Sequence, residues 1–380
     1  MSTDIRILLD EAVTLLREMV AIPSPSFMEE EVCSHISSRL SSFGIEHIRV
    51  KNNLLSVNRN YSPLRKTLML CAHIDTVVPA ADYSFDPYRP EYSEFEPGMP
   101  AVLGLGSNDD GASAVALISA FRHFYDSPLP ANLMLVLSAE EERSGKNGMD
   151  AVWSALERGL PYNGTMVRIP DWAIIGEPTC MRAAIAERGL LVIDGTAHGA
   201  SGHAATGDGV NALYEALDDI ARLRAFRFPK VSPQMGEVRI NVTQIQAGYA
   251  HNVIPQTCEF VVDVRTTDMY TNSEIMEILQ SLCRSELRAR NLHNRASCTP
   301  ESSVLPECAA ATGISTFISP TTSDWMRIGC DAVKMGPGDS SRSHKKDEYV
   351  TVGEIEDGIR KYIGFIYNLE KTENNGNTLE

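Results

Sequence analysis

The chain lacks long apolar runs and closely spaced cysteine pairs. No apolar stretch approaches the roughly 18 residues that a membrane-spanning helix needs. The eight cysteines are scattered, with no Cys-x-x-Cys pair, so neither a disulfide framework nor a zinc knot is expected. Residues 1–20 carry acidic side chains among their leucines and lack the basic start of a secretion signal. We therefore expect a cytoplasmic protein that does not bind a membrane.

Positive charge is also scarce. The 34 lysines and arginines are outnumbered by 50 aspartates and glutamates, and the formal net charge is -16. This balance argues against nucleic acid as a partner, because phosphate binding requires clustered basic side chains. It is compatible with a carboxylate-rich metal site, although acidic surface residues alone would produce the same total.

The chain does contain a regular alternation of short apolar runs and helical stretches. Its 380 residues exceed what one hydrophobic core usually supports, so two domains are expected. Buried runs that alternate with helices, such as 112–124, predict an α/β fold, a mostly parallel sheet sandwiched by helices. The runs lie at 68–73, 132–142, 172–178 and 332–338.

Two helices are predicted before this alternation begins. Apolar residues recur at three-to-four spacing from Ile5 to Met19, and two prolines then end the pattern. Ser26 followed by Glu29 is typical of an N-cap and its capping-box partner, which predicts the start of the second helix.

The pattern changes between about residues 182 and 302. Alternating apolar residues, as in 237–246, predict half-exposed antiparallel strands, and helical stretches separate them. Because the run at 332–338 resembles the earlier ones, this α+β segment is interpreted as an insertion. We predict a catalytic domain at 1–181 and 303–370, an inserted lid and dimerisation domain at 182–302, and a disordered tail at 371–380.

Candidate metal ligands follow the ends of the apolar runs. In an open α/β sheet, ligands bind at the carboxyl ends of the strands, so these side chains are expected at one edge. Nitrogen and carboxylate ligands without thiolates suit zinc, with cobalt or manganese as substitutes. Five ligands exceed what one open catalytic zinc uses and suit two ions that share a carboxylate. The four candidates that follow the runs are His73, Glu142, Glu177 and His344, and Asp109, in the glycine-flanked loop at 104–111, is the fifth.

Two further acidic residues stand beside these ligands. Residues i and i+2 of a strand share a face, so Asp75 is placed to accept the free imidazole N–H of His73. Glu141, next to Glu142, is placed to act as a general base. The simpler alternatives are a turn residue at Asp75 and a solvated helix start at 140–142.

The glycine-flanked loop GLGSNDDG at 104–111 has a second interpretation as a nucleotide-binding turn. Its third glycine is misplaced for that role, and a bound phosphate would face Asp109 and Asp110. We therefore favour the interpretation of this loop as part of a metal site.

Taken in order, the motifs resemble those of the di-zinc aminoacylase/carboxypeptidase family. This family includes acetylornithine deacetylases, succinyl-diaminopimelate desuccinylases and glutamate-releasing carboxypeptidases. The resemblance extends from about residue 8 to residue 366. It rests on CAHIDTVVP at 71–79, GLGSNDDG at 104–111, SAEEE at 138–142, IGEPT at 175–179, GASGHAA at 199–205 with HNVIP at 251–255, and GPGDSSRSHKKDEYV at 336–350.

The resemblance implies a role for each candidate ligand. One zinc ion would be held by His73 and Glu177, and the other by Glu142 and His344. Asp109 would bridge the two ions.

The resemblance also implies the catalytic groups. Glu141 would be the base, Asp75 would orient a ligand, and His203 of the lid would reach the site of a partner subunit in a homodimer. A cis peptide bond would join Asp109 to Asp110. The carboxylate of the substrate would be held by Arg188, Asn252, Arg265 and the turn that begins at Thr322, although Arg265 could instead be a salt-bridge residue.

The sequence departs from the family pattern at three places. Asp110-Gly111-Ala112 stands where many relatives have Met-Lys-Gly, and a proline that follows the lid histidine in the family is absent after His203. The usual Asp-Glu-Glu is Glu140-Glu141-Glu142, which leaves a one-residue ambiguity about which glutamate is the base. None of these departures changes the type of a ligand.

The closing motif most resembles the acetylornithine-deacetylase branch. It predicts a zinc-dependent deacylase of arginine biosynthesis whose small-molecule substrate is N-acetylornithine, or an N-acetyl or N-succinyl form of citrulline or ornithine. The alternatives are a succinyl-diaminopimelate desuccinylase or a dipeptidase with the same metal centre. A non-catalytic metal-binding protein is disfavoured, because neither a ligand nor the base is missing.

Overall fold

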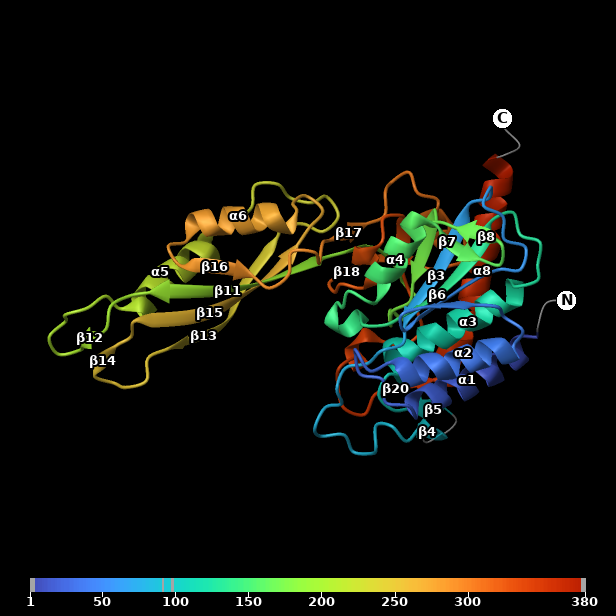
Figure 1. Ribbon diagram of the computed structural model, residues 1–380, viewed down its shortest axis with the longest axis horizontal. Helices are drawn as coiled ribbons and strands as arrows, with labels where there is room; N and C mark the ends of the chain where they lie inside the picture. The colour runs from blue at the N-terminus through green and yellow to red at the C-terminus, as the bar shows by residue number, and fades with distance from the viewer. Residues whose placement is uncertain (1–3, 91, 97–98, 377–380) are drawn as a thin grey trace. The chain divides into compact units, whose positions relative to one another are not determined.

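The computed structural model describes residues 4–90, 92–96 and 99–376 (Figure 1). Contacts between residues divide the chain into two units. The first comprises the described residues up to Ile185, Thr299–Phe317 and those from Ser323 onward, and the second comprises Ala186–Cys298 and Ile318–Thr322. The catalytic and lid roles that the sequence suggests for two such parts stay predictions.

A mixed, mainly parallel sheet forms the centre of the first unit. Strands β6, β3, β9 and β19 are parallel to one another, and the strands outside them pair antiparallel. The predicted α/β architecture, with helices on both faces, is confirmed. The strand order is β1 (Ile48–Val50), β2 (Asn53–Val57), β6 (Asn132–Ser138), β3 (Thr67–His73), β9 (Trp172–Ile175), β19 (Asp331–Lys334) and β10 (Ala183–Glu187), and β18 (Thr316–Ser319) pairs with β10.

Each face of this sheet has its own hydrophobic core, because successive strand residues point to opposite sides. Leu68 and Leu70 of β3 pack with α1, α3 and α8, whereas Met69 and Cys71 pack with α4. The helices of the unit are α1 (Ile5–Val20), α2 (Glu30–Ser42), α3 (Ala112–Phe124), α4 (Met149–Arg158), α7 (Leu305–Ala311) and α8 (Val352–Gly376). Among the described residues, none of the helices combines the length and the apolar character needed to cross a membrane.

Shorter elements complete the first unit. A small sheet consists of β4 (Tyr92–Glu96), β5 (Met99–Leu103) and β20 (Tyr349–Thr351), and β7 (Leu160–Tyr162) pairs with β8 (Thr165–Val167). Short helical turns at Glu141–Arg143, Asp324–Arg327 and Ser340–Arg342 lie in the loops.

The second unit is a four-stranded antiparallel sheet with two helices on one face (Figure 1). Residues of β11 alternate between buried and half-buried, which places one row of apolar side chains against α5 and α6. The sheet order is β13 (Arg239–Ala247), β15 (Thr257–Thr266), β11 (Gly189–His198) and β16 (Glu286–Ala289); the other elements are α5 (Ala212–Ala225), α6 (Asn272–Leu282), the pair β12 (Gly202–His203) and β14 (Val253–Ile254), and β17 (Ser297–Cys298).

One local prediction was wrong. Helix α2 begins at Glu30 with Glu29 at its N-cap, and the hydroxyl of Ser26 instead donates to Asp75 at 2.7 Å. A long-range hydrogen bond thus replaced the local capping bond. Helix α8 extends to Gly376, and residues 377–380 lie outside the described residues, so the predicted disordered tail at 371–380 stays a prediction.

Gly176, which follows β9, allows the loop before α3 to approach the edge of the sheet. A Cβ atom there would lie 2.7 Å from Ser113 Cβ and 2.9 Å from Asp110 Oδ2. Gly176→Ala should therefore lower the free energy of unfolding by about 1–3 kcal/mol, measured by urea denaturation. Gly353→Ala is the matched control, since no atom lies within 4 Å of the new methyl group. Equal stability of the two variants would contradict this close approach.

Candidate metal centre

Polar side chains gather at the carboxyl edge of the central sheet in the first unit. His73 is the last residue of β3, Glu141 and Glu142 follow β6, and Glu177 follows β9. Because β3, β6 and β9 are parallel, these residues come to one edge of the sheet. Asp109 lies in the loop that precedes α3.

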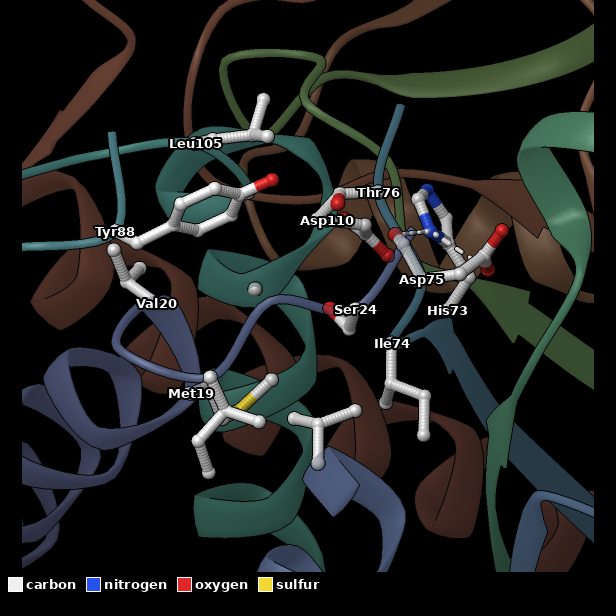
Figure 2. A pocket seen from close by; sticks show the side chains of 14 residues that line it. Met19, Val20, Ser24, His73, Ile74, Asp75, Thr76, Tyr88, Leu105 and Asp110 are labelled. Atoms are coloured by element: carbon white, nitrogen blue, oxygen red, sulfur yellow. Dashed lines mark hydrogen bonds and ion pairs between the residues drawn. The ribbon is translucent and has the colours of Figure 1, made fainter. Parts of the chain in front are cut away.

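The imidazole of His73 is fixed from both sides, and Figure 2 shows it beside Asp75. Its Nδ1 lies 2.9 Å from the main-chain oxygen of Asp75 and 3.5 Å from the carboxylate of Asp75. Its Nε2 lies 3.2 Å from Oδ1 of Asp109. Burial opposes protonation, but the hydrogen bonds to Asp109 and Asp75 raise the pKa of His73 well above its usual value. With Nδ1–H donating to the carbonyl, Nε2 is the atom available to a metal.

Asp75 is a buried carboxylate that positions both neighbouring glutamates. Its Oδ1 accepts the backbone N–H of Glu141 at 3.0 Å, and its Oδ2 accepts that of Glu142 at 3.1 Å. The hydroxyl of Ser26 also donates to Oδ2. Burial alone would raise the pKa of Asp75, but the hydrogen bonds with His73 and Ser26 lower it. The aspartate therefore remains an acceptor.

The loop that carries Asp109 is anchored by Glu348. The buried carboxylate of Glu348 accepts backbone N–H groups from Gly106 at 3.1 Å, Asn108 at 2.9 Å and Asp109 at 2.9 Å. Burial and the charge of Asp109 outweigh these bonds and raise the pKa of Glu348 to about 8. The peptide bond between Asp109 and Asp110 is cis, as the resemblance implied.

Sequence reasoning did not single out Glu348. Its one indication was its position within the last motif, four residues after His344. A local pattern cannot show that an acid accepts three backbone N–H groups from residues more than two hundred positions away.

Glu142, Asp109 and His344 form the more exposed side of the cluster. Nε2 of His344 lies 2.9 Å from Oε2 of Glu142 and 3.7 Å from Oδ2 of Asp109. The hydrogen bond to Glu142 raises the pKa of His344. The His344 side chain is 56% exposed, whereas that of Glu142 is 6% exposed.

Nitrogen and oxygen atoms of these residues lie close enough to share a metal ion. Within the described part of the chain, His73, Asp109 and Glu142 form one candidate group and His73, Glu141 and Glu177 form another, each with ligand atoms within 4.8 Å of one another. Burial, followed by neighbouring carboxylates, raises the pKa values of Glu141 and Glu177 well above the usual range. A divalent cation would offset that repulsion, so the residues present fit a metal centre.

Glu140 and Glu141 have different surroundings. The carboxylate of Glu140 accepts the backbone N–H of Asn147 at 3.0 Å and its side-chain amide at 2.9 Å. Glu141, in contrast, belongs to a candidate metal group with His73 and Glu177. This difference favours Glu141 over Glu140 as the base, a role that stays a prediction.

The predicted substrate-binding arginines of the second unit have partners within that unit. Arg188 is buried and donates to the main-chain oxygens of Met235 and Glu237. Arg265 pairs with Asp263 of the same strand at 2.9 Å.

The remaining predicted residues of this unit lie nearer the surface. His203 and Asn252 are exposed, and Thr322 is half-buried. Nδ1 of His203 accepts the N–H of Ala205 at 3.1 Å. Their predicted roles toward a substrate remain predictions.

A comparison with known protein families matches one part of the chain. Residues 185–291 match the family described as the peptidase dimerisation domain of M20 type. This match covers much of the unit that holds α5 and α6. The match suggests self-association.

Similar proteins extend the comparison to the whole chain. The chain is 27% identical to a succinyl-diaminopimelate desuccinylase of Corynebacterium glutamicum, with 92% of this chain and 94% of that protein covered. It is 28% identical to an acetylornithine deacetylase of Myxococcus xanthus, with 90% and 92% covered. The YXEP protein of Bacillus subtilis, described as a dinuclear metal-binding M20 peptidase, has the same fold, with a TM-score of 0.67, 15% identity, and 97% and 99% coverage.

The role of Glu348 as an anchor can be tested by Glu348→Ala. Removal of this carboxylate leaves three buried N–H groups without their acceptor, so the free energy of unfolding should fall by more than about 2 kcal/mol. Bound metal per chain should also fall, since Asp109 loses its support. The measurements are urea denaturation and metal analysis. Glu356→Ala is the control, because it removes only a surface pair with Arg360. If both variants behave alike, Glu348 does not hold the loop.

Proposed function

We propose that this chain, a metal-dependent amide hydrolase related to the M20 peptidases and deacylases, removes the acyl group from a small N-acyl amino acid. N-acetylornithine is the first candidate substrate, followed by N-acetylcitrulline and the N-succinyl analogues. The observation that carries the proposal is Glu141, a half-buried acid whose carboxylate lies beside the candidate ligands His73 and Glu177. The similarity to an acetylornithine deacetylase over 90% of this chain supports the choice of substrate.

We propose that the centre holds two zinc ions, for which cobalt or manganese could substitute. The ligands would be His73, Asp109, Glu142, Glu177 and His344, a set of nitrogen and oxygen donors that suits zinc. When bound, the ions would polarise the amide carbonyl and lower the pKa of a water molecule.

Glu141 is assigned the proton transfers of the reaction. It takes a proton from the attacking water and later delivers it to the nitrogen of the leaving amine. It belongs to a candidate metal group with His73 and Glu177, which places it beside the proposed ions. Asp75 positions this base through the backbone N–H of Glu141.

A homodimer that assembles through the second unit is part of this proposal. The match of residues 185–291 to a peptidase dimerisation domain supports it. His203, in β12 of that unit, is then proposed to stabilise the oxyanion in the site of the partner subunit. Asn252 and Thr322 are proposed to contact the carboxylate of the substrate.

A second candidate function is the removal of a succinyl group from diaminopimelate. The similarity to a desuccinylase, which covers 92% of this chain, favours it. A dipeptidase with the same metal centre would use the same base and ligands.

The proposed activity predicts a rank order of substrates. Zinc-loaded enzyme should hydrolyse N-acetylornithine with a higher kcat/KM than succinyl-diaminopimelate or simple dipeptides, and a chelator should abolish turnover. In the same assay, Glu141→Gln should lose about 10²–10⁴-fold in kcat while it retains metal, because an amide cannot accept the proton of water.

Glu157→Gln, on the exposed side of α4, is the control for that substitution. A dipeptide as the best substrate would refute the deacylase proposal. A near-normal kcat in Glu141→Gln would instead show that another residue is the base.

The two-ion proposal predicts about two zinc ions per chain by metal analysis. Glu142→Ala should reduce this number to about one, since it removes a ligand from only one of the two proposed ions. A single tightly bound ion whose amount does not change in Glu142→Ala would contradict the bridged arrangement.

A further inference from the structure

The turn between α1 and α2 exposes two apolar side chains. Phe27 is 57% exposed and Met28 is 68% exposed. The N–H of Met28 donates to the carbonyl of Pro25 at 2.8 Å, and Phe27 has a φ of 76°. Bulky residues rarely adopt this left-handed conformation. Neither burial nor backbone preference therefore explains an aromatic residue at this position.

Two buried carboxylates tie this turn to the segment that carries Glu141. Asp75 accepts hydrogen bonds from the hydroxyl of Ser26 and from the backbone N–H of Glu141. Oε1 of the buried Glu29 accepts the backbone N–H of Phe27 at 2.5 Å and that of Glu140 at 3.3 Å. The backbone of Phe27 and the residue just before the proposed base thus share one oxygen atom. The exposed turn is held beside the candidate site.

A third exposed apolar residue comes from the segment that follows β3. The N–H of Thr76 donates to the carbonyl of Ser24 at 2.9 Å, and the N–H of Ser26 donates to the carbonyl of Thr76 at 3.2 Å. Val78, two residues farther along, is 74% exposed. We call the three side chains of Phe27, Met28 and Val78 the apolar edge.

The charge around the apolar edge selects which half of a substrate can lie there. Two exposed acidic residues, Glu30 and Glu31, lie two and three positions after Met28. A carboxylate on the substrate would be repelled by these groups, whereas an uncharged chain would not. The amino-acid half of an N-acyl amino acid carries a carboxylate, and a succinyl group carries another. An apolar acyl chain is the part that fits.

We propose that the apolar edge contacts the acyl chain of the substrate and makes the enzyme selective for apolar acyl groups longer than acetyl over succinyl. This inference rests on the proposed deacylase function and narrows its substrate class. Exposed apolar side chains held beside a site offer a surface that an acyl chain would remove from water.

A series of acyl groups on one amino acid tests the proposal. With N-acetyl-, N-butanoyl- and N-hexanoylornithine, kcat/KM should rise about two- to fourfold for each added methylene. N-succinylornithine should be a poorer substrate than N-butanoylornithine, which has the same number of acyl carbons without the second carboxylate.

Substitutions in the apolar edge should weaken the dependence of kcat/KM on acyl length. Phe27→Asn suits the left-handed backbone, and Met28→Gln keeps the length of the side chain. In each variant the hexanoyl-to-acetyl ratio of kcat/KM should fall about threefold or more. Leu64→Asn is the control, because Leu64 is 93% exposed but precedes the start of β3, at the end of the strand opposite His73. Its ratio should equal that of the wild type, and thermal denaturation should show that all three variants are folded.

The outcomes separate this inference from the proposed function. The wild-type enzyme could hydrolyse N-acyl amino acids with a kcat/KM that does not depend on acyl length, or both edge variants could keep the wild-type dependence. Either result would refute the role of the apolar edge and leave the deacylase function standing. Selectivity that follows the amino-acid side chain would also refute the acyl assignment. Hydrolysis of dipeptides but of no N-acyl amino acid would refute both.

Discussion

The carboxylate of Asp75 is the interaction on which the candidate site depends. It accepts the backbone N–H groups of Glu141 and Glu142 and the hydroxyl of Ser26, and it lies 3.5 Å from Nδ1 of His73. One buried group thus joins the end of β3, the turn after β6 and the turn before α2. A neutral side chain of similar size could not accept as many hydrogen bonds at comparable strength.

Buried carboxyl groups accept backbone N–H groups at two other places in the first unit. Glu348 accepts three N–H groups from the loop of Asp109, and Glu29 accepts those of Phe27 and Glu140. Backbone groups in buried, irregular turns need acceptors because no helix or strand supplies them. A carboxyl group satisfies several at once. At Glu348, burial and the nearby Asp109 raise the pKa of this group to about 8.

The strands and helices that carry the site could be predicted because their apolar patterns are local. Strand β3 (Thr67–His73) contains the predicted run 68–73 and begins one residue earlier. Helix α3 (Ala112–Phe124) has the bounds expected from the sequence. The carboxyl ends of β3, β6 and β9 follow from these runs. The local rule failed at Ser26, where a capping pattern in the sequence competed with a hydrogen bond to a residue 49 positions away.

The sequence by itself determined the kinds of ligand and the strand ends that present them, because apolar periodicity and residue type are properties of neighbouring positions. Only the tertiary structure decided which partner each polar group meets. In the folded chain the carboxylate of Glu140 accepts hydrogen bonds from Asn147, whereas Glu141 lies beside His73. The guanidinium of Arg188 donates to main-chain oxygens. The physical reason is that buried polar groups take whichever partner the packed chain brings within reach, often from a distant segment.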